Sequence, residues 1–246
     1  MNKMHGMDNW YTQSPGQMLL ALECQFLDRL MARMPGQVLL QIGGCSDLSL
    51  ARSSLAAHRV YLSLDGAVSE DFPTIVCDLE HLPLQSESVD VVILAHALSS
   101  TDVPASVLSQ VRAALRPGGQ LLIVDFNPWS AWGVVKRFSR RQDFPWQSQF
   151  HSISKLKRCL RQVDLQYITA HTLCYQWPWR RQKRWLSTPL VETLGSLLLP
   201  GCGGVYMILA QKQAPGMTPL VDAWAIREKN KLMANWPSAS ARRNIE

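Results

Sequence analysis

The feature that most limits the fold of this chain is an ordered series of apolar runs, each followed by small or acidic residues. The first run ends in two glycines (QVLLQIGGCSD, residues 37–47), and the second ends in an aspartate (HRVYLSLDG, residues 58–66). Two longer pieces follow, DLEHLPLQSESVDVVILAHAL at residues 78–98 and LRPGGQLLIVDF at residues 115–126. This order and spacing are typical of a nucleoside-binding α/β sheet.

Strands and helices are predicted to alternate along the first half of the chain. We expect strands at residues 38–42, 59–64, 74–77, 89–95 and 120–126, and helices at residues 16–34, 48–57 and 103–115. In the second half we expect helices at residues 152–162 and 220–233, and strands at residues 165–173 and 205–211. A continuous apolar run such as residues 89–95 is typical of a parallel strand that is covered on both faces. The chain is therefore predicted to form a doubly wound, mostly parallel α/β sheet.

Size and composition favour one globular domain with appendages. At 246 residues and 47% hydrophobic content, the chain can bury one full core, but it is too short for two large domains. Residues 1–10 lack the apolar segment of a signal peptide. The longest apolar stretch, residues 191–210, contains Glu192, Pro200 and four glycines, so no transmembrane segment is expected.

The six cysteines are scattered, without a Cys-x-x-Cys pair and without a histidine at metal-ligand spacing. We interpret them as reduced thiols and expect a cytoplasmic protein without a metal site.

Charge is distributed unevenly along the chain. Residues 1–126 hold seven basic and 13 acidic residues, whereas residues 127–186 hold 12 basic and two acidic residues. Within the second part, Trp177, Trp179 and Trp185 alternate with Arg180, Arg181, Lys183 and Arg184. Three interpretations of the basic region at residues 129–186 remain open: a solvated lid over a substrate, a contact with an anionic membrane surface, or a contact with RNA.

The order of the motifs resembles the class I S-adenosylmethionine-dependent methyltransferases that act on small molecules. The resemblance covers residues 38–126 and depends most on DLEHLPLQSESVDVV and ALRPGGQLLIVDF. The segments WYTQSPGQ, FNPWSAWG and GCGGVYMILAQK also resemble a group of compact methyltransferase-like proteins of proteobacteria. The resemblance implies a Rossmann-like sheet of seven strands and S-adenosylmethionine as the cofactor. The expected parts are an N-terminal helical segment (1–36), a methyltransferase-like domain (37–212, with an insertion at about 175–200) and a C-terminal tail (213–246).

The resemblance assigns the methionine part of the cofactor to the glycine turn after the first strand, because glycine lets the backbone approach a ligand closely. The family pattern is acidic-x-Gly-x-Gly-x-Gly. In this chain Gln41 replaces the acid, Gly43 matches, and Cys45 and Asp47 stand where glycines are usual. Gly44 lies within the same turn. Asp47 either supplies the missing negative charge for the cofactor's ammonium group or caps the helix expected at residue 48.

Two further aspartates are candidates for contacts with the nucleoside. Asp65, followed by Gly66, ends the second strand, where an acidic group accepts hydrogen bonds from ribose hydroxyls; the alternative is a turn residue. The resemblance places Asp78 near the exocyclic amine of adenine and Leu79 against its ring. The alternative for Asp78 is a turn cap. Asp90 is interpreted as a residue that closes a turn or caps a strand.

His96 is the candidate catalytic residue. It follows Ala95, the last residue of the fourth strand and another expected cofactor contact, at the sheet edge where such folds bind ligands. Methyl transfer needs an aligned nucleophile and at most one base, and His96 is suited to deprotonate a phenol or an amine. The alternative is a histidine that only packs or hydrogen-bonds locally. Asn127-Pro128 follows the wrong strand and lacks the second proline and the aromatic residue of the amino-methyltransferase motif.

These residues predict methyl transfer from S-adenosylmethionine to an unidentified acceptor, a small molecule. The alternative is a non-catalytic, methyltransferase-like binding or regulatory protein, because the glycine turn is altered at Cys45 and Asp47. A nicotinamide-dependent oxidoreductase is disfavoured because the first turn lacks Gly-x-Gly-x-x-Gly.

Overall fold

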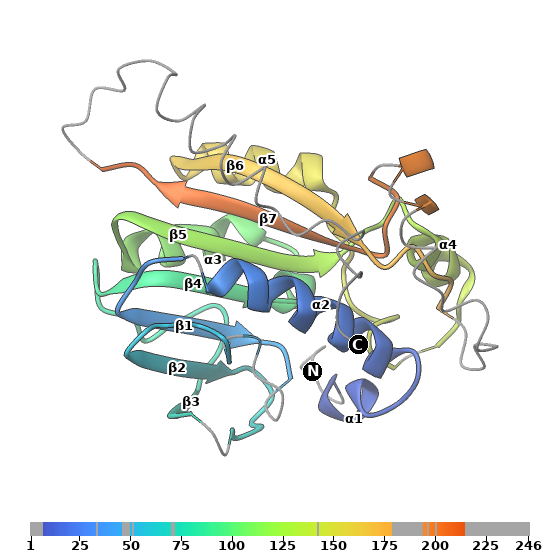
Figure 1. Cartoon of the computed structure of the whole chain (residues 1–246), viewed down its shortest axis with the longest axis horizontal. Helices are drawn as coiled ribbons and strands as arrows, with labels where there is room; N and C mark the ends of the chain where they lie inside the picture. The colour runs from blue at the N-terminus through green and yellow to red at the C-terminus, as the bar shows by residue number, and fades with distance from the viewer. Residues whose placement is uncertain are drawn as a thin grey trace, which may run out of the picture.

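The chain forms one twisted sheet of seven strands (Figure 1). The computed structural model describes residues 7–32, 34–45, 50, 52–69, 72–141, 143–178, 194–195, 197–199 and 201–214. The strands are β1 (Val38–Gly43), β2 (His58–Ser63), β3 (Thr74–Val76), β4 (Val89–Ala95), β5 (Leu115–Phe126), β6 (Leu165–Leu173) and β7 (Val205–Lys212). Their order is β3-β2-β1-β4-β5-β7-β6, and only β7 runs antiparallel to its neighbours. This confirms the predicted doubly wound, mostly parallel sheet.

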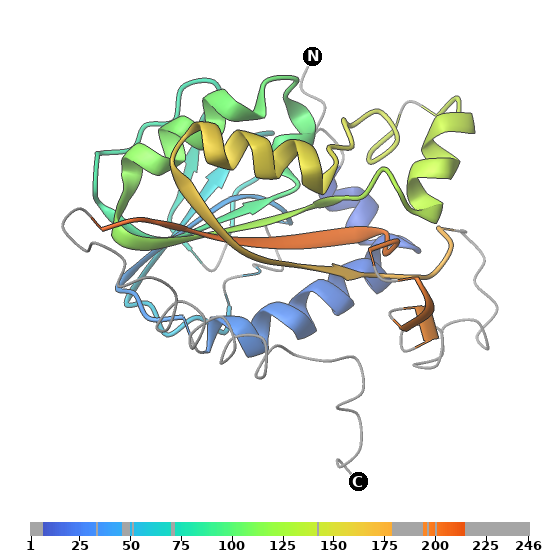
Figure 2. The same ribbon diagram turned by 90° about the horizontal axis from the view of Figure 1, so that it is seen from above.

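Helices cover both faces of the sheet (Figure 2). They are α1 (Met7–Tyr11), α2 (Gly16–Met31), α3 (Pro104–Ala114), α4 (Ala131–Phe138) and α5 (Ile153–Gln162), with a short 3-10 helix, η1 (Ala97–Ser100). Alternate side chains of β4 lie on opposite faces of the sheet. Val91 and Ile93 pack in the core on the α2 side. Val92 and Leu94 pack in the core on the side of α3 and α5. Burial on both faces explains the continuous apolar run of β4.

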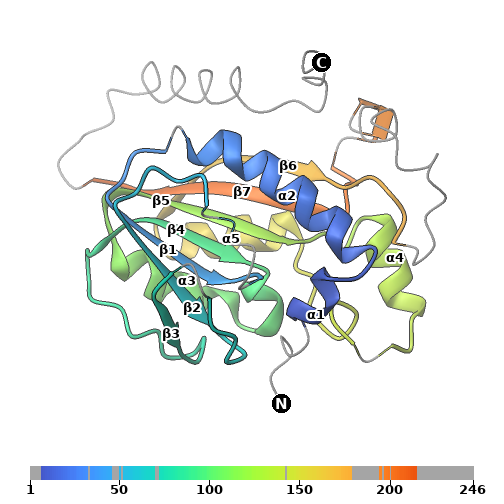
Figure 3. The same ribbon diagram turned by 60° about the horizontal axis from the view of Figure 1, so that its bottom comes forward.

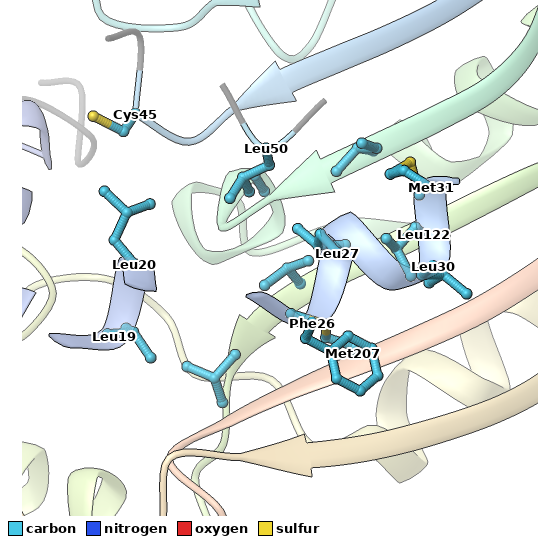
Figure 4. Packing of buried hydrophobic residues seen from close by; sticks show 14 of the residues in the cluster. Leu19, Leu20, Phe26, Leu27, Leu30, Met31, Cys45, Leu50, Leu122 and Met207 are labelled. Carbon is cyan, nitrogen blue, oxygen red and sulfur yellow. The ribbon is translucent and has the colours of Figure 1, made fainter. Parts of the chain in front are cut away.

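Helix α2 is held on the sheet by its apolar face. Figure 4 shows Leu27 and Leu30 of this helix near Leu122 of β5, and Phe26 near Met207 of β7. The buried residues recur every three or four positions, as on one side of a helix. Each fully buried leucine contributes about 2 kcal/mol. Glu23 lies on the same buried face, so the packing that fixes α2 also carries one carboxylate into the interior.

The predicted helix at residues 48–57 is wrong in its described part. Residues 52–57 form turns and irregular chain, and residues 46–49 and 51 lie outside the described residues. Serine side chains bind neighbouring groups here: Ser54 Oγ accepts from the Ala56 amide at 3.1 Å, and Ser53 Oγ donates to Asp28. Such side-chain bonds offer the backbone an alternative to helical bonds.

Other differences concern element boundaries and two short helices. The strand expected from residue 120 begins at Leu115, because this residue already pairs with Val89 of β4. Helices α1 and α4 were not predicted. The helix expected at residues 220–233 lies outside the described residues. Within the described part of the chain, no helix combines the length and apolar character needed to cross a membrane.

Asp90 joins three chain segments at the amino end of the sheet. Its Oδ2 accepts hydrogen bonds from the amides of Gln37 (2.8 Å) and Val38 (2.9 Å), and Oδ1 lies 2.9 Å from Arg116 Nη1. This agrees with the predicted role of Asp90 as a cap. Burial acts against the charged form, but the two amides and Arg116 outweigh it and lower the carboxyl pKa.

Replacing Asp90 with Asn is expected to lower the free energy of unfolding by about 2 kcal/mol at pH 7, because bonds to a charged acceptor are lost. Urea unfolding followed by tryptophan fluorescence measures the change. Asp164→Asn is the control, since the Asp164 side chain is 83% exposed and lies 3.7 Å from Arg112, and we expect a loss below about 0.5 kcal/mol. Equal losses in the two variants would contradict the capping role.

Candidate active site

The carboxyl ends of β1 and β4 meet where the chain connections diverge, with β2 on one side and β5 on the other. Ligands bind at this kind of point in open α/β sheets. Gly43 pairs with Ala95 across the two strands. Gly43 and Gly44 have φ of 71° and 83°, and a Cβ added to Gly44 would lie 2.9 Å from Ala95 Cβ. The turn therefore needs glycine at position 44 for both its conformation and the available space.

The two non-glycine positions of the turn differ in what the structure shows of them. Cys45 is 3% exposed and belongs to the core cluster of α2, and Figure 4 shows it near Leu20. Its side chain therefore has a place in the core beneath α2. Asp47 lies outside the described residues. Gln41 is buried, and its amide donates to the Gly43 carbonyl at 3.1 Å, so it braces the turn from within.

Asp65 lies two residues after β2 and is half-buried. Its Oδ1 accepts from Ser63 Oγ at 3.2 Å and from the Ala67 amide at 3.3 Å. Gly66 is exposed with φ of 90°. Oδ2 makes no hydrogen bond within the described residues, so Asp65 both closes its turn and keeps one oxygen available at the sheet edge.

Asp78 and Leu79 follow β3 and differ in burial. Asp78 is exposed, and its Oδ1 accepts from the Glu80 amide at 3.4 Å. Leu79 is 6% exposed and packs in the core on the α3 side. The side chains of Asp78, Glu80 and His81 offer ligand atoms within 4.8 Å of one another, but all three are exposed, and such acidic groups are common without an ion.

His96 occupies an unusual backbone position at the end of β4. It is fully buried, with φ of 53° in the left-handed region, and it precedes η1. This conformation costs a residue other than glycine about 1–2 kcal/mol. Such strain is concentrated at functional sites, where the surrounding structure maintains it.

Two buried carboxylates flank the His96 ring. Nε2 lies 2.9 Å from Glu23 Oε1 of α2, and Nδ1 lies 3.9 Å from Asp125 Oδ1 of β5. Glu23 accepts the Nε2 proton, which makes Nδ1 the basic nitrogen of the neutral ring. The distance of 3.9 Å is too long for a hydrogen bond. His96 Nδ1 and Asp125 Oδ2 are both buried without a hydrogen-bond partner among the described residues.

Burial and the two neighbouring charges change how this cluster titrates. Burial is the largest effect on Asp125 and raises its pKa from 3.8 to about 7, although His96 and the Phe126 amide act in the opposite direction. Burial lowers the pKa of His96, but Glu23 and then Asp125 outweigh it, so that the pKa lies above 6.5. The pKa of Asp125 thus lies in the range in which acid and base groups of enzymes titrate.

Aromatic side chains cover the cluster. Phe126 lies 4.4 Å from the His96 ring between centroids, and Tyr11 of α1 lies 6.2 Å away. Tyr11 Oη donates to Glu23 Oε2 at 3.5 Å. Phe144 lies 6.4 Å from His96. Figure 3 shows α1 near the carboxyl ends of β1 and β4, where it covers this end of the sheet.

The described part of the basic region consists mainly of α4 and α5. Several of its cations have partners within the protein: Lys157 lies 4.0 Å from the Tyr167 ring centroid, and Arg141 Nη2 lies 2.8 Å from Asp143. Arg180, Arg181, Lys183 and Arg184 lie outside the described residues, as do Trp179 and Trp185. Asn127 has a structural role, since its Nδ2 donates to the carbonyls of Gly201 and Gly203.

Comparisons with known proteins agree with this architecture. Residues 45–123 match the model of the methyltransferase domain family. The chain is 30% identical over 183 residues to the uncharacterized protein YafS of Escherichia coli K12, covering 73% of this chain and 72% of YafS. It is also 30% identical over 121 residues to the ubiquinone/menaquinone biosynthesis C-methyltransferase UbiE of Paraburkholderia phymatum, covering 42% of this chain and 48% of UbiE. This second match spans about half the length of the enzyme.

Among solved structures, a S-adenosylmethionine-dependent methyltransferase of Thermotoga maritima aligns with a TM-score of 0.62 at 16% identity, covering 86% of this chain and 100% of that chain. At this identity the likeness concerns the fold. Together with the sequence relatives, it shows that this chain belongs to the class I S-adenosylmethionine-dependent methyltransferase family. Its cofactor is S-adenosylmethionine, and its class of activity is methyl transfer.

Proposed function

We propose that this chain methylates a small molecule with an ionisable proton, a phenol or an amine, and that His96 removes this proton. The observation that carries the proposal is the buried His96 ring beside the glycine turn. Glu23 holds its Nε2, and Nδ1 has no partner within the described residues. The UbiE relative, named for a biosynthetic C-methylation, supports a small-molecule acceptor.

The cofactor supplies an electrophilic methyl group on a positively charged sulfur, and the bond electrons remain with sulfur when the methyl group leaves. The chain's residues therefore need to orient the acceptor and take up one proton. Nδ1 of His96 receives that proton, while Glu23 keeps the ring in the required tautomer. Asp125 stabilises the imidazolium that results. Because the cluster is fully buried, the cover formed by α1 and Phe144 moves to admit an acceptor.

The contacts that we propose for the cofactor follow the sheet edge from β3 to β4. Adenine lies against Asp78 and Leu79, and the ribose hydroxyls bind Asp65 beside Gly66. The methionine part lies against Gly43, Gly44, Cys45, Asp47 and Ala95. The available Oδ2 of Asp65 supports the ribose contact, and the glycine backbone at positions 43 and 44 supports the methionine contact.

We also propose that residues 37–212 form the methyltransferase domain, with residues 1–36 as its N-terminal helical segment and residues 213–246 as a tail. The cysteines support a cytoplasmic location, because none of the six forms a disulfide.

Calorimetric titration with S-adenosylmethionine and S-adenosylhomocysteine tests cofactor binding. We expect Asp65→Ala and Asp65→Asn to weaken binding about tenfold to a hundredfold, because a charged acceptor of two hydroxyl groups is lost. Asn keeps an oxygen for Ser63 and the Ala67 amide, so it preserves the turn. Wild-type affinity in the Asn variant with a loss only in the Ala variant would show that Asp65 is a turn residue. Asp164→Asn serves as the distant control, because Asn tolerates the left-handed backbone of this residue (φ of 52°).

Absence of binding by the folded wild-type chain, with no cofactor detected by mass spectrometry of the purified protein, would contradict the proposal. It would favour the non-catalytic alternative, in which the altered turn at Cys45 and Asp47 no longer binds the cofactor.

A further inference from the structure

Helix α4 exposes large apolar side chains. Trp129 is 76% exposed, Val134 48% and Phe138 80%. Val134 and Phe138 are four residues apart and share one side of the helix. Trp129 directly precedes the N-cap Ser130, a position that lies beside the fourth helical residue, Val134. Val134 and Phe138 therefore form one exposed apolar side of α4, and Trp129 adds a third exposed apolar side chain where the helix begins.

The opposite side of α4 is fixed to the protein. Trp132 is fully buried, and its indole Nε1 donates to the Gln176 carbonyl at 2.9 Å. Lys136 Nζ donates to the Ser148 carbonyl and lies 4.5 Å from the Phe150 ring centroid. The exposed apolar side is therefore held rigidly toward solvent while this inner side anchors the helix.

Two arginines accompany the exposed apolar residues. Arg137 lies between Val134 and Phe138 in the sequence, and Arg140 follows the helix; both are exposed. Neither makes a hydrogen bond or an ion pair within the part of the chain that the structure describes. No acidic residue occurs between residues 127 and 141. The surface thus combines apolar side chains with uncompensated positive charge.

We propose that the α4 surface, formed by Trp129, Val134, Arg137, Phe138 and Arg140, binds the surface of an anionic phospholipid membrane. Helices that lie in a membrane interface place apolar side chains among the lipid chains and cations beside the phosphates. Tryptophan favours this interface because its ring is apolar and its N–H is polar. RNA fits less well, since Val134 offers a base no aromatic ring for stacking.

The α4 surface lies at the same end of the molecule as the candidate active site (Figure 1). Trp132 of α4 stacks on Phe126 with centroids 5.9 Å apart, and Phe126 in turn contacts the His96 ring. Residues 194–195 and 197–199 lie at the same end of the molecule in Figure 1, and they include four exposed leucines, Leu194, Leu197, Leu198 and Leu199. When this protein is bound to a membrane through α4, the end of the sheet that holds the candidate active site would face the lipid. This orientation suits an acceptor that is dissolved in the membrane. That last step rests on the proposed function, whereas membrane binding does not.

Co-sedimentation of the full chain with vesicles tests the proposal. We expect binding to vesicles of phosphatidylglycerol and phosphatidylcholine, weaker binding to phosphatidylcholine alone, and a decrease with added salt. Replacing both Trp129 and Phe138 with Ser is expected to lower the partition coefficient about tenfold or more. Replacing both Arg137 and Arg140 with Gln is expected to lower it about tenfold on the anionic vesicles.

Two control variants match these changes elsewhere on the surface. Leu55→Ser removes an exposed apolar side chain (79% exposed) at the amino end of β2. The double change Arg158→Gln and Arg161→Gln removes two exposed cations of α5. Each control is expected to stay within about twofold of wild type, since these sites lie outside the α4 surface.

Failure of the wild type to bind anionic vesicles, or equal losses in the controls, would overturn the proposal. It would also be overturned if a single-stranded oligouridylate bound instead and lost affinity in the same α4 variants. Titration with S-adenosylmethionine tests the proposed transferase activity separately from membrane binding. We expect the α4 variants to keep wild-type affinity for the cofactor even where they lose binding to vesicles.

Discussion

Replacing His96 with Asn is expected to lower the rate of methyl transfer about 10²-fold to 10⁴-fold, the usual contribution of a general base. Asn is the suitable replacement because it tolerates the left-handed backbone that His96 adopts. The assay follows release of S-adenosylhomocysteine with pools of bacterial small molecules and lipids as acceptors. With any acceptor that the wild type uses, we expect the variant to keep its cofactor affinity.

The pH profile separates a base from a residue that only packs. In the wild type, kcat/KM should rise with pH as the His96 cation loses its proton, with a midpoint above 6.5, because Glu23 and Asp125 outweigh burial and raise its pKa. Glu23→Gln should move this midpoint down. An unchanged profile in His96→Asn, or a rate loss accompanied by an equal loss of cofactor affinity, would contradict the assignment.

The fold could be predicted from the sequence where one periodicity dominates. The strands at residues 89–95 and 165–173 have the predicted bounds. In the first of them every side chain except that of Asp90 is buried, which explains its apolar run. The expected helix at residues 48–57 fails because serine side chains form local bonds that a periodicity argument does not weigh. Helix α4 was not predicted because Val134 and Phe138 are apolar but exposed, so the apolar pattern of the helix does not mark a buried face.

The sequence identified the candidate base of the site but not the two carboxylates beside it. His96 was identified because it follows a buried strand, whereas its partners Glu23 and Asp125 were missed. Glu23 lies 73 residues from His96, and only the packing of α2 brings them together. Each partner nevertheless carried a signal: Glu23 interrupts the apolar face of a helix, and Asp125 interrupts an apolar strand. An acidic residue inside an apolar pattern has a large desolvation cost and needs a partner.

Replacing Asp125 with Asn is expected to stabilise the protein at pH 8 by about 2–4 kcal/mol and to leave its stability almost unchanged at pH 4. Burial raises the pKa of Asp125 to about 7, so the folded chain retains a proton that the unfolded chain releases near 3.8. Stability from this group is therefore lost as pH rises from about 4 through about 7. Asn carries no charge, and its oxygen can still accept the Phe126 amide, which lies 2.8 Å from Asp125 Oδ1.

Urea unfolding at pH 4, 6 and 8 measures the difference between wild type and variant, with Asp90→Asn as a control of opposite sign. The Asp90 pKa is lowered, so its charge stabilises the fold above the unfolded value and Asn should destabilise more at pH 8 than at pH 4. If Asp125→Asn were destabilising at pH 8, the buried carboxylate would be a structural partner of His96. If the Asp125→Asn variant is more stable and slower in methyl transfer, Asp125 lowers the stability of the fold but contributes to activity. Such a trade-off is common at the active sites of enzymes.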